Sequence, residues 1–253
     1  MVNTSTSDRL PISPTRSPDA GFVWWQSLLF AVVLLLALVI PSVFVLVFMM
    51  VGGLVHERDL RTFSWQLLVG QFVSYVSALA VMVPLLPALA RRSWPALGLR
   101  MPRWSDAGYG IGGAIVMVLA TAATGAAQDA IFHLKPDEVQ VQWLRAARGP
   151  LIGIFVVLAC AAAPFFEELT FRGFVFNALR RYTPVWVAVV VSAIIFGLSH
   201  WQPGNAGAIA PLCAGGIVLA LVYVRTGSLV ASMLTHAAFN LVTVVLVLVL
   251  HQS

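Results

Sequence analysis

The sequence is poor in charge. Acidic and basic residues together make up 10% of its 253 residues, whereas hydrophobic residues make up 60%. Soluble domains average ~25% charged and ~45–50% apolar residues. The composition therefore excludes a soluble globule, a disordered chain and a fibrous repeat, and it predicts an integral membrane protein. At ~20 residues per span, the length allows one domain of about seven spans, or eight.

Cysteine and lysine are also scarce. Cys160 and Cys213 both lie inside apolar runs, which favours free packing thiols over a disulfide framework. Lys135 is the single lysine, and the other fourteen basic residues are arginines. Most of them fall in short loops between apolar runs, where basic residues set the orientation of a membrane protein. The net charge of +5 therefore does not point to nucleic-acid binding, and we expect no nucleic-acid partner. Nine basic residues on the side of the N-terminal tail, against five on the other, favour the tail side as cytoplasmic.

The apolar runs predict an all-α, multi-pass bundle in the cell membrane. Residues 1–21 are polar and are expected to form a disordered tail, and residues 22–253 a single transmembrane domain. No polar turn divides the first run, so we expect one long helix there despite Pro41. Residues 133–149 form a polar connection that suits a surface helix. The predicted spans are about residues 22–55, 64–89, 107–132, 151–180, 184–200, 206–224 and 228–250.

Two adjacent acids stand in the middle of the fourth span. Glu167 and Glu168 share this helix with Arg172, and no acidic residue follows them. A charge near the bilayer centre costs at least ~2.5–3.5 kcal/mol on insertion scales, so three together indicate a site, although a buried ion pair that only fixes packing is the simpler alternative. Glu168 and Arg172 are i,i+4 and face each other, whereas Glu167 points about 100° away. We therefore predict that Arg172 holds Glu168 and that Glu167 is the reactive general base. Pro164 removes a backbone hydrogen bond just before them and can open the helix.

Two later spans carry further polar groups. His200 ends the fifth span, and His236 and Asn240 lie at i,i+4 in the seventh. Each histidine alone could be an ordinary packing residue, but the combination argues against this. At ~1.5 Å rise per residue, Glu167 and Asn240 lie ~20 Å from one membrane face, His200 ~24 Å and His236 ~13 Å. Three spans thus bring a carboxylate, two imidazoles and an amide to a similar level.

These groups suit hydrolysis of a peptide bond. A carboxylate base can deprotonate water, and His and Asn donors can stabilise the oxyanion on the scissile carbonyl. The Glu pair are the only acids in the middle of a span, which leaves no acid there for a Ser-His-Asp set, and the absence of HExxH excludes a zincin helix. A membrane transporter or proton relay is the alternative, because intramembrane Glu, His and Arg also mark proton pathways, but no inverted repeat is evident. A non-catalytic immunity or scaffold protein is a third possibility.

Three ordered motifs strengthen the peptidase hypothesis. They are residues 164–173 (PFFEELTFRG), Phe196-x-x-x-His200, and His236-x-x-x-Asn240 preceded by Thr-Gly-Ser-Leu at 226–229. The first resembles the EExxxR signature of the CAAX-protease and bacteriocin-processing (CPBP, Abi) family of intramembrane proteases, and the others resemble its second and third motifs. The resemblance covers about residues 150–245, which would be the catalytic core.

The resemblance implies an intramembrane peptidase, of glutamate or metallo type, that cuts membrane-associated or CAAX-like peptides or proteins. It implies that Glu167 and His200 activate water and that His236 and Asn240 form the oxyanion hole. The supporting residues would be Glu168, Arg172 and Phe196. The family is often described as metalloproteases, and Glu167, His200 and His236 could bind zinc. These ligands come from three helices without a short-spaced pair, so we expect no essential metal. The oligomeric state stays open.

Overall fold

The computed structural model describes residues 21–55, 64–135, 139–202 and 205–250. Within these ranges every regular element is a helix, which confirms the predicted all-α class. Most of the predicted polar tail lies outside them. In chain order the helices are α1 (Trp24–Val51), α3 (Trp65–Ala90), η1 (Pro95–Leu97), α4 (Trp104–Phe132), α5 (Val139–Ala146), α6 (Pro150–Val157), η2 (Leu158–Ala162), α7 (Ala163–Glu168), η3 (Leu169–Phe176), α8 (Asn177–Tyr182), α9 (Val185–Ser199), η4 (Ala206–Ala208), α10 (Ile209–Thr226) and α11 (Leu229–Leu250).

Six helical segments of the described chain are long and apolar enough to cross a membrane: 24–51, 65–90, 104–132, 150–182, 206–226 and 229–250. The protein is therefore a multi-pass integral membrane protein. The remaining predicted span corresponds to α9, which is apolar but only 15 residues long. At ~1.5 Å per residue this helix falls short of a ~30 Å hydrocarbon core.

The first span is one helix, as the sequence predicted. Pro41 lies inside α1, which runs without interruption from Trp24 to Val51. The polar connection after α4 contains the short helix α5, which agrees with a surface helix there. Cys160 and Cys213 are both free thiols.

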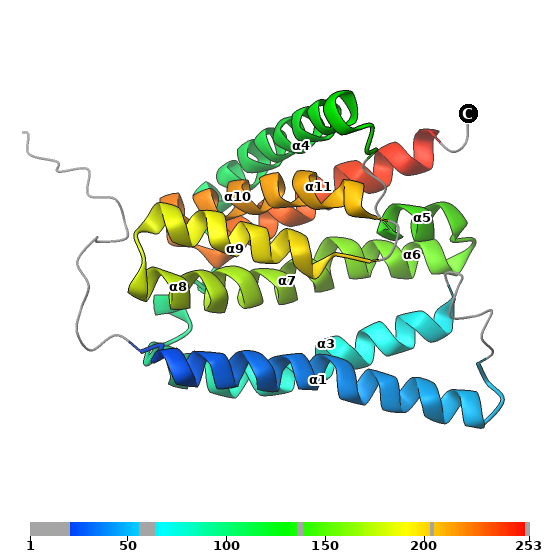
Figure 1. Ribbon diagram of the computed structural model, residues 1–253, viewed down its shortest axis with the longest axis horizontal. Helices are drawn as coiled ribbons and strands as arrows, with labels where there is room; N and C mark the ends of the chain where they lie inside the picture. The colour runs from blue at the N-terminus through cyan, green and yellow to red at the C-terminus, as the bar shows by residue number, and fades with distance from the viewer. Residues whose placement is uncertain (1–20, 56–63, 136–138, 203–204, 251–253) are drawn as a thin grey trace, which may run out of the picture.

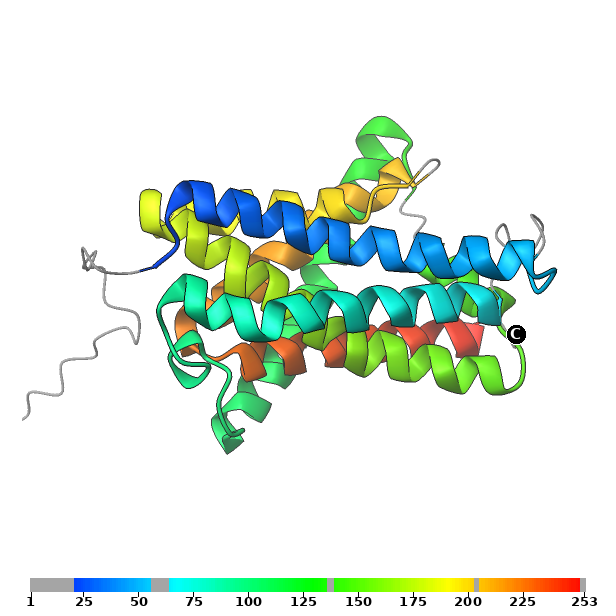
Figure 2. The same cartoon turned by 90° about the horizontal axis from the view of Figure 1, so that it is seen from below.

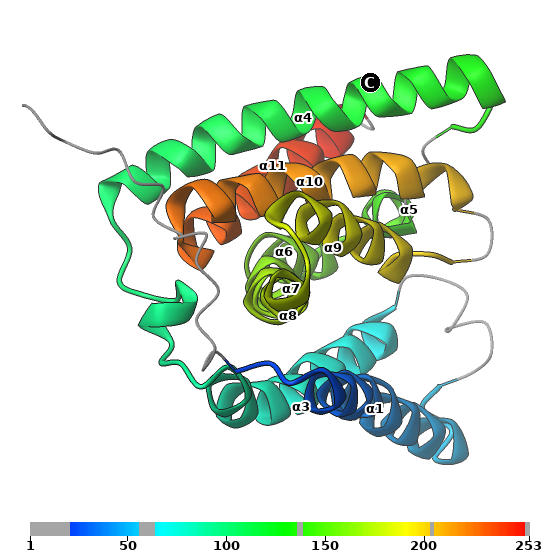
Figure 3. The same ribbon diagram turned by 60° about the vertical axis from the view of Figure 1, so that its left-hand side comes forward.

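The fourth span, α6 to α8, lies in the middle of the molecule. It is flanked on one side by the pair α1 and α3 and on the other by α9, α10 and α11, with α4 covering α10 and α11 (Figures 1 and 3). Seen from below, α1 and α3 run side by side along most of their length (Figure 2). The central position of the fourth span explains why its charged residues are shielded from lipid.

Aromatic contacts attach the α1–α3 pair to the fourth span. The rings of Phe30 and Phe174 meet edge to face with centroids 4.7 Å apart, and those of Tyr75 and Phe166 are 4.9 Å apart. Aromatic pairs of this kind add ~0.5–1.5 kcal/mol beyond the area they bury. Tyr75 is thereby held beside the helix that carries the glutamate pair.

Small residues allow the later helices to approach closely. A Cβ atom on Gly113 of α4 would lie 2.6 Å from Thr235 Oγ1 of α11. A Cβ on Gly197 of α9 would overlap with Cys213 Sγ of α10. These contacts fix the two helices that carry His200 and His236.

The fourth span contains two π-helical segments, η2 and η3, on either side of α7. At the end of η2 the Ala163 N–H donates to Leu158 O, five residues back. Pro164 follows directly and has no N–H to donate. Its effect is therefore a wider turn within a continuous helix, not a break. Such π-helical turns are frequent at functional sites.

Candidate active site

The four predicted catalytic side chains line one cavity of about 160 Å³. Glu167 comes from α7, His200 is the residue that caps α9, and His236 and Asn240 come from α11. Apolar side chains form most of the remaining wall, including Leu67 from α3, Leu144 from α5, and Phe155, Leu158, Phe239 and Val244 from α6, η2 and α11. The fold thus brings together polar residues that are up to 73 positions apart (167 to 240) in a mainly apolar cavity.

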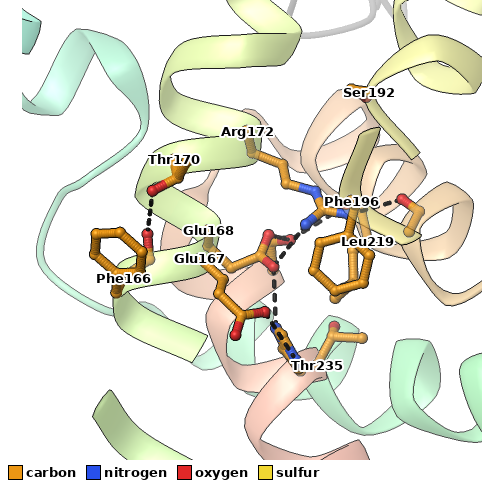
Figure 4. Close-up of polar contacts among 12 residues, drawn as sticks. Phe166, Glu167, Glu168, Thr170, Arg172, Ser192, Phe196, Leu219 and Thr235 are labelled. Atoms are coloured by element: carbon orange, nitrogen blue, oxygen red, sulfur yellow. Dashed lines mark hydrogen bonds and ion pairs between the residues drawn. The ribbon is translucent and has the colours of Figure 1, made fainter. Parts of the chain in front are cut away.

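Glu168 is fully buried, and its carboxylate is surrounded by donors. Arg172 Nη1 donates to Glu168 Oε1 over 2.9 Å, which is the predicted i,i+4 pair. Ser232 Oγ donates to Glu168 Oε2. His236 Nδ1 lies 3.1 Å from Glu168 Oε1. Figure 4 shows Glu168 turned toward Arg172 while the Glu167 carboxylate lies apart from that pair.

Arg172 is also fully buried, and it is held by more than its carboxylate partner. Its Nη2 donates to Gly216 O of α10 over 2.8 Å. Its guanidinium carbon stands 5.0 Å from the centroid of the Phe196 ring, within range of a cation–π contact. Two charges buried this deeply depend on each other, because removing one leaves the other without compensation.

Phe196 lies at the centre of the site. Its ring packs edge to face on Phe171, with centroids 5.0 Å apart, and it is 1% exposed. The same ring lies 4.8 Å from the His200 ring and 5.9 Å from the His236 ring, centroid to centroid. Phe196 therefore contacts Arg172 and both imidazoles. The Phe-x-x-x-His spacing places its ring on the same helical face as His200.

Glu167 differs from its neighbour in having an unsatisfied oxygen. Its Oε2 atom is buried and accepts no hydrogen bond from any described residue. The nearest ring nitrogens are His200 Nε2 at 3.8 Å and His236 Nε2 at 3.9 Å. These distances are too long for direct hydrogen bonds but can be bridged by a water molecule. The Glu167 carboxylate therefore faces the cavity with one oxygen that can still accept a hydrogen bond or a proton.

The hydrogen bonds of the two imidazoles indicate their tautomers. His200 Nδ1 lies 2.8 Å from Phe196 O, and a carbonyl oxygen can only accept, so Nδ1 carries the proton. His236 Nδ1 faces the Glu168 carboxylate, which implies the same arrangement. In the neutral state both rings therefore present an Nε2 lone pair toward Glu167. Three acceptors converge, and they call for a hydrogen-bond donor such as water, for protonation, or for a cation.

Zinc fits this set of donors in chemistry but not in the observed spacing. Ligand atoms at ~2.0–2.2 Å from a tetrahedral zinc lie about 3.3–3.6 Å apart. Glu167 Oε2 is farther than this from both Nε2 atoms, at 3.8 and 3.9 Å. Across the described ranges, no group of three or more His, Cys, Asp or Glu residues is arranged to hold a metal ion. The absence of an essential metal stays a prediction.

Asn240 makes a contact that the sequence did not suggest. Its Nδ2 donates to Ala159 O of η2 over 2.7 Å. Because a carbonyl accepts only, this bond assigns the amide nitrogen to the side facing η2. The second N–H and Oδ1 have no hydrogen-bond partner that the structure records within the described chain. Asn240 can therefore still donate to a peptide in the cavity.

Sequence reasoning missed several residues of the site. Ser232 could have been noticed, because it lies four positions before His236 on the same helical face. Gln71 and Tyr75 of α3, and Gln140 and Trp143 of α5, also line the cavity. No motif marks these four, and their contribution depends on how α3 and α5 pack against the core.

Comparison with known proteins agrees with the three motifs. Residues 149–242 match the family model described as "Type II CAAX prenyl endopeptidase Rce1-like". This range contains Glu167, His200, His236 and Asn240, and it confirms the resemblance to the CAAX-protease and bacteriocin-processing family. No solved structure gives a significant match.

Three relatives are similar over parts of the chain. An uncharacterized protein of Mycoplasma capricolum is 29% identical over 96 residues, which is 38% of this chain and 28% of the relative. An uncharacterized 24.3 kDa protein of Escherichia coli is 31% identical over 88 residues, 34% of this chain and 38% of the relative. The "Putative membrane peptidase YdiL" of Bacillus subtilis is 20% identical over 179 residues, 69% of each chain. The chain thus spans well under half the length of the first two relatives.

Proposed function

We propose that this protein is an intramembrane endopeptidase that hydrolyses a peptide bond of a membrane-associated, CAAX-like substrate. The observation that carries the proposal is the unsatisfied Oε2 of Glu167, which faces the Nε2 atoms of His200 and His236 in a mainly apolar cavity. A general base must lie within hydrogen-bond distance of the proton that it removes, either directly or through one water molecule. The family match and the relative named as a membrane peptidase support the same activity.

In the proposed reaction, a water molecule between Glu167 and His200 gives a proton to the Glu167 carboxylate. The resulting hydroxide attacks the carbonyl carbon of the scissile bond, and the C=O electron pair moves to the oxygen. Asn240 and His236 donate to this oxyanion. His236 can do so only as an imidazolium, because its Nδ1 already faces Glu168. When the tetrahedral intermediate collapses, Glu167 passes its proton to the leaving amine, so the products are a carboxylic acid and an amine.

Glu168 and Arg172 have a separate task in this proposal. Their mutual bond and the contacts to Ser232 and Gly216 hold the fourth span against α10 and α11. Glu168 also fixes the ring of His236 through Nδ1. Metal-free catalysis by glutamate is the favoured form, and no step requires a bound ion.

The test uses purified protein in detergent and quenched peptides with and without a prenylated C-terminal cysteine. Cleavage by the wild type that is abolished by Glu167→Gln supports the proposal. Asp129→Asn is the matched control, because it also removes a membrane-helix carboxylate but lies outside the cavity lining. Solute or proton uptake by proteoliposomes that depends on Glu167, without cleavage of any peptide, would instead select the transporter.

A further inference from the structure

The carbonyl of Ala159 has lost its helical donor. In an α-helix it would accept from residue 163, and in a π-helix from residue 164. The Ala163 N–H donates to Leu158 O instead. Residue 164 is proline, which has no N–H. The wide turn of η2 and the proline together therefore leave Ala159 O open to a donor from elsewhere.

Asn240 supplies that donor from α11. The Nδ2–Ala159 O distance of 2.7 Å is short for an N–H···O bond, and the bond joins residues 81 positions apart. Ala159 and Asn240 both line the cavity that Glu167 also lines. The bond fixes which way the amide of Asn240 faces, since only its nitrogen can point to a carbonyl.

We propose that Pro164 is a positioning residue of the site: by lacking an N–H, it reserves the Ala159 carbonyl for Asn240 and so orients the Asn240 amide within the cavity. The consequence for catalysis rests on the proposed function. The free second N–H of an amide held in this way can be directed at the oxyanion at no further cost in side-chain entropy. An amide without the anchor would rotate among several orientations.

An alanine in place of Pro164 weakens the anchor whichever helical register follows. In a π-helical turn the new N–H of residue 164 reaches Ala159 O. If the segment relaxes to an α-helix, the new N–H reaches Cys160 O and the N–H of residue 163 reaches Ala159 O. In both cases the helix itself supplies the carbonyl with a donor, so Asn240 must share the oxygen with a backbone N–H and its anchor is weakened.

The first test is a thermal-stability cycle in detergent with wild type, Pro164→Ala, Asn240→Ala and the double variant. With Pro164 present, Asn240→Ala leaves a part-buried carbonyl without a donor, and we expect the Tm to fall by about 2–4 °C. In the Pro164→Ala background, we expect the same change to lower the Tm by less than about 1 °C. Equal losses in both backgrounds would overturn the proposal. This readout does not depend on peptidase activity.

The second test separates the N–H from the side chain. Pro164→Ala is compared with lactic acid at position 164, which has the alanine methyl group but an ester in place of the N–H. We expect Pro164→Ala to lower kcat about tenfold with KM changed less than about twofold, the equivalent of one hydrogen bond in the transition state. The lactic acid variant should return to within about twofold of wild type. Pro84→Ala, which restores an N–H in α3 outside the cavity, should leave kcat unchanged.

The two tests distinguish the failure of this proposal from the failure of the proposed function. If the wild type cleaves peptides and Asn240→Ala slows it while Pro164→Ala does not, the positioning role is wrong and the peptidase stands. If the wild type cleaves nothing but the stability cycle shows the coupling, the anchor is real and the peptidase assignment is wrong.

Discussion

Ser232 Oγ donates to Oε2 of Glu168, and so connects the buried carboxylate of α7 to a residue 64 positions later in α11. The same hydroxyl also lies 3.2 Å from Leu219 O of α10. Glu168 thus joins the fourth span to α11, with Arg172 and His236 as its other partners. Among the described residues its neighbour Glu167 has no such network, since its buried Oε2 accepts no hydrogen bond there, and this difference underlies the first prediction.

The two glutamates should differ in their response to the same substitution. Glu167→Gln should give a folded, membrane-inserted protein without detectable cleavage. Glu168→Gln should lower stability by about 3–5 kcal/mol, because it leaves Arg172 buried without a counter-ion. Glu168→Gln with Arg172→Met should recover part of this loss, since both charges are removed. The measurements are Tm and turnover in one detergent. Equal stability of the two single variants, without rescue by the pair, would contradict the division of roles.

Ser232→Ala tests the donor to Glu168 directly. Loss of this hydroxyl leaves a buried carboxylate oxygen without a donor, and we expect a loss of about 1–3 kcal/mol in the free energy of unfolding. Ser192→Ala is the control. Ser192 is equally buried, but its hydroxyl donates to Val189 O in its own helix. Comparable losses for both variants would show that Ser232 contributes no more than an ordinary buried serine.

Alanine substitutions of the two site histidines should also have different effects on turnover and Tm. His200→Ala should abolish cleavage with little change in Tm, because the ring bonds only to Phe196 O and Ser199 Oγ of its own segment among described residues. His236→Ala and Asn240→Ala should each cost roughly 10²–10³ in kcat as oxyanion donors. His236→Ala should in addition lower the Tm, since it removes a partner of Glu168. Wild-type turnover by both histidine variants would refute the site.

Close packing of α4 on α11 can be tested with two adjacent glycines. Gly113→Ala places a methyl group 2.6 Å from Thr235 Oγ1 and 2.8 Å from its Cγ2, and we expect a loss of about 1–3 kcal/mol. Gly112→Ala meets no atom within 4 Å and should be neutral or stabilising by up to about 1 kcal/mol. Chemical or thermal unfolding of both variants decides the matter, and a neutral Gly113→Ala would show that the helices can separate freely.

Activity should survive strong chelation. The Glu167 and histidine atoms stand farther apart than zinc ligands do, so we expect well below one metal ion per chain after purification and unchanged kcat with a chelator. Elemental analysis and turnover before and after chelation provide the measurement. Stoichiometric zinc whose removal stops cleavage and whose return restores it would refute metal-free catalysis.

Much of the architecture could be read from the sequence. Apolar runs must form helices in lipid, because each backbone polar group needs a partner within its own segment. The Glu168–Arg172 bond also follows from local geometry, since residues four apart share a helical face. Helical rise alone indicated that Glu167, His200, His236 and Asn240 lie at similar depth, and they line one cavity.

The remaining features depend on how separate helices pack. Ser232 and His236 reach Glu168, and Asn240 reaches Ala159, only because α11 lies against η2 and α7. The same holds for Tyr75 of α3 and Trp143 of α5 in the cavity wall. Helical period and hydrophobicity fix which residues share a face, but the rotation and register of one helix against another arise from close contacts such as Gly113 on Thr235. Lipid is as apolar as the helix surfaces, so an apolar pattern cannot select among these arrangements, and tertiary packing decides them.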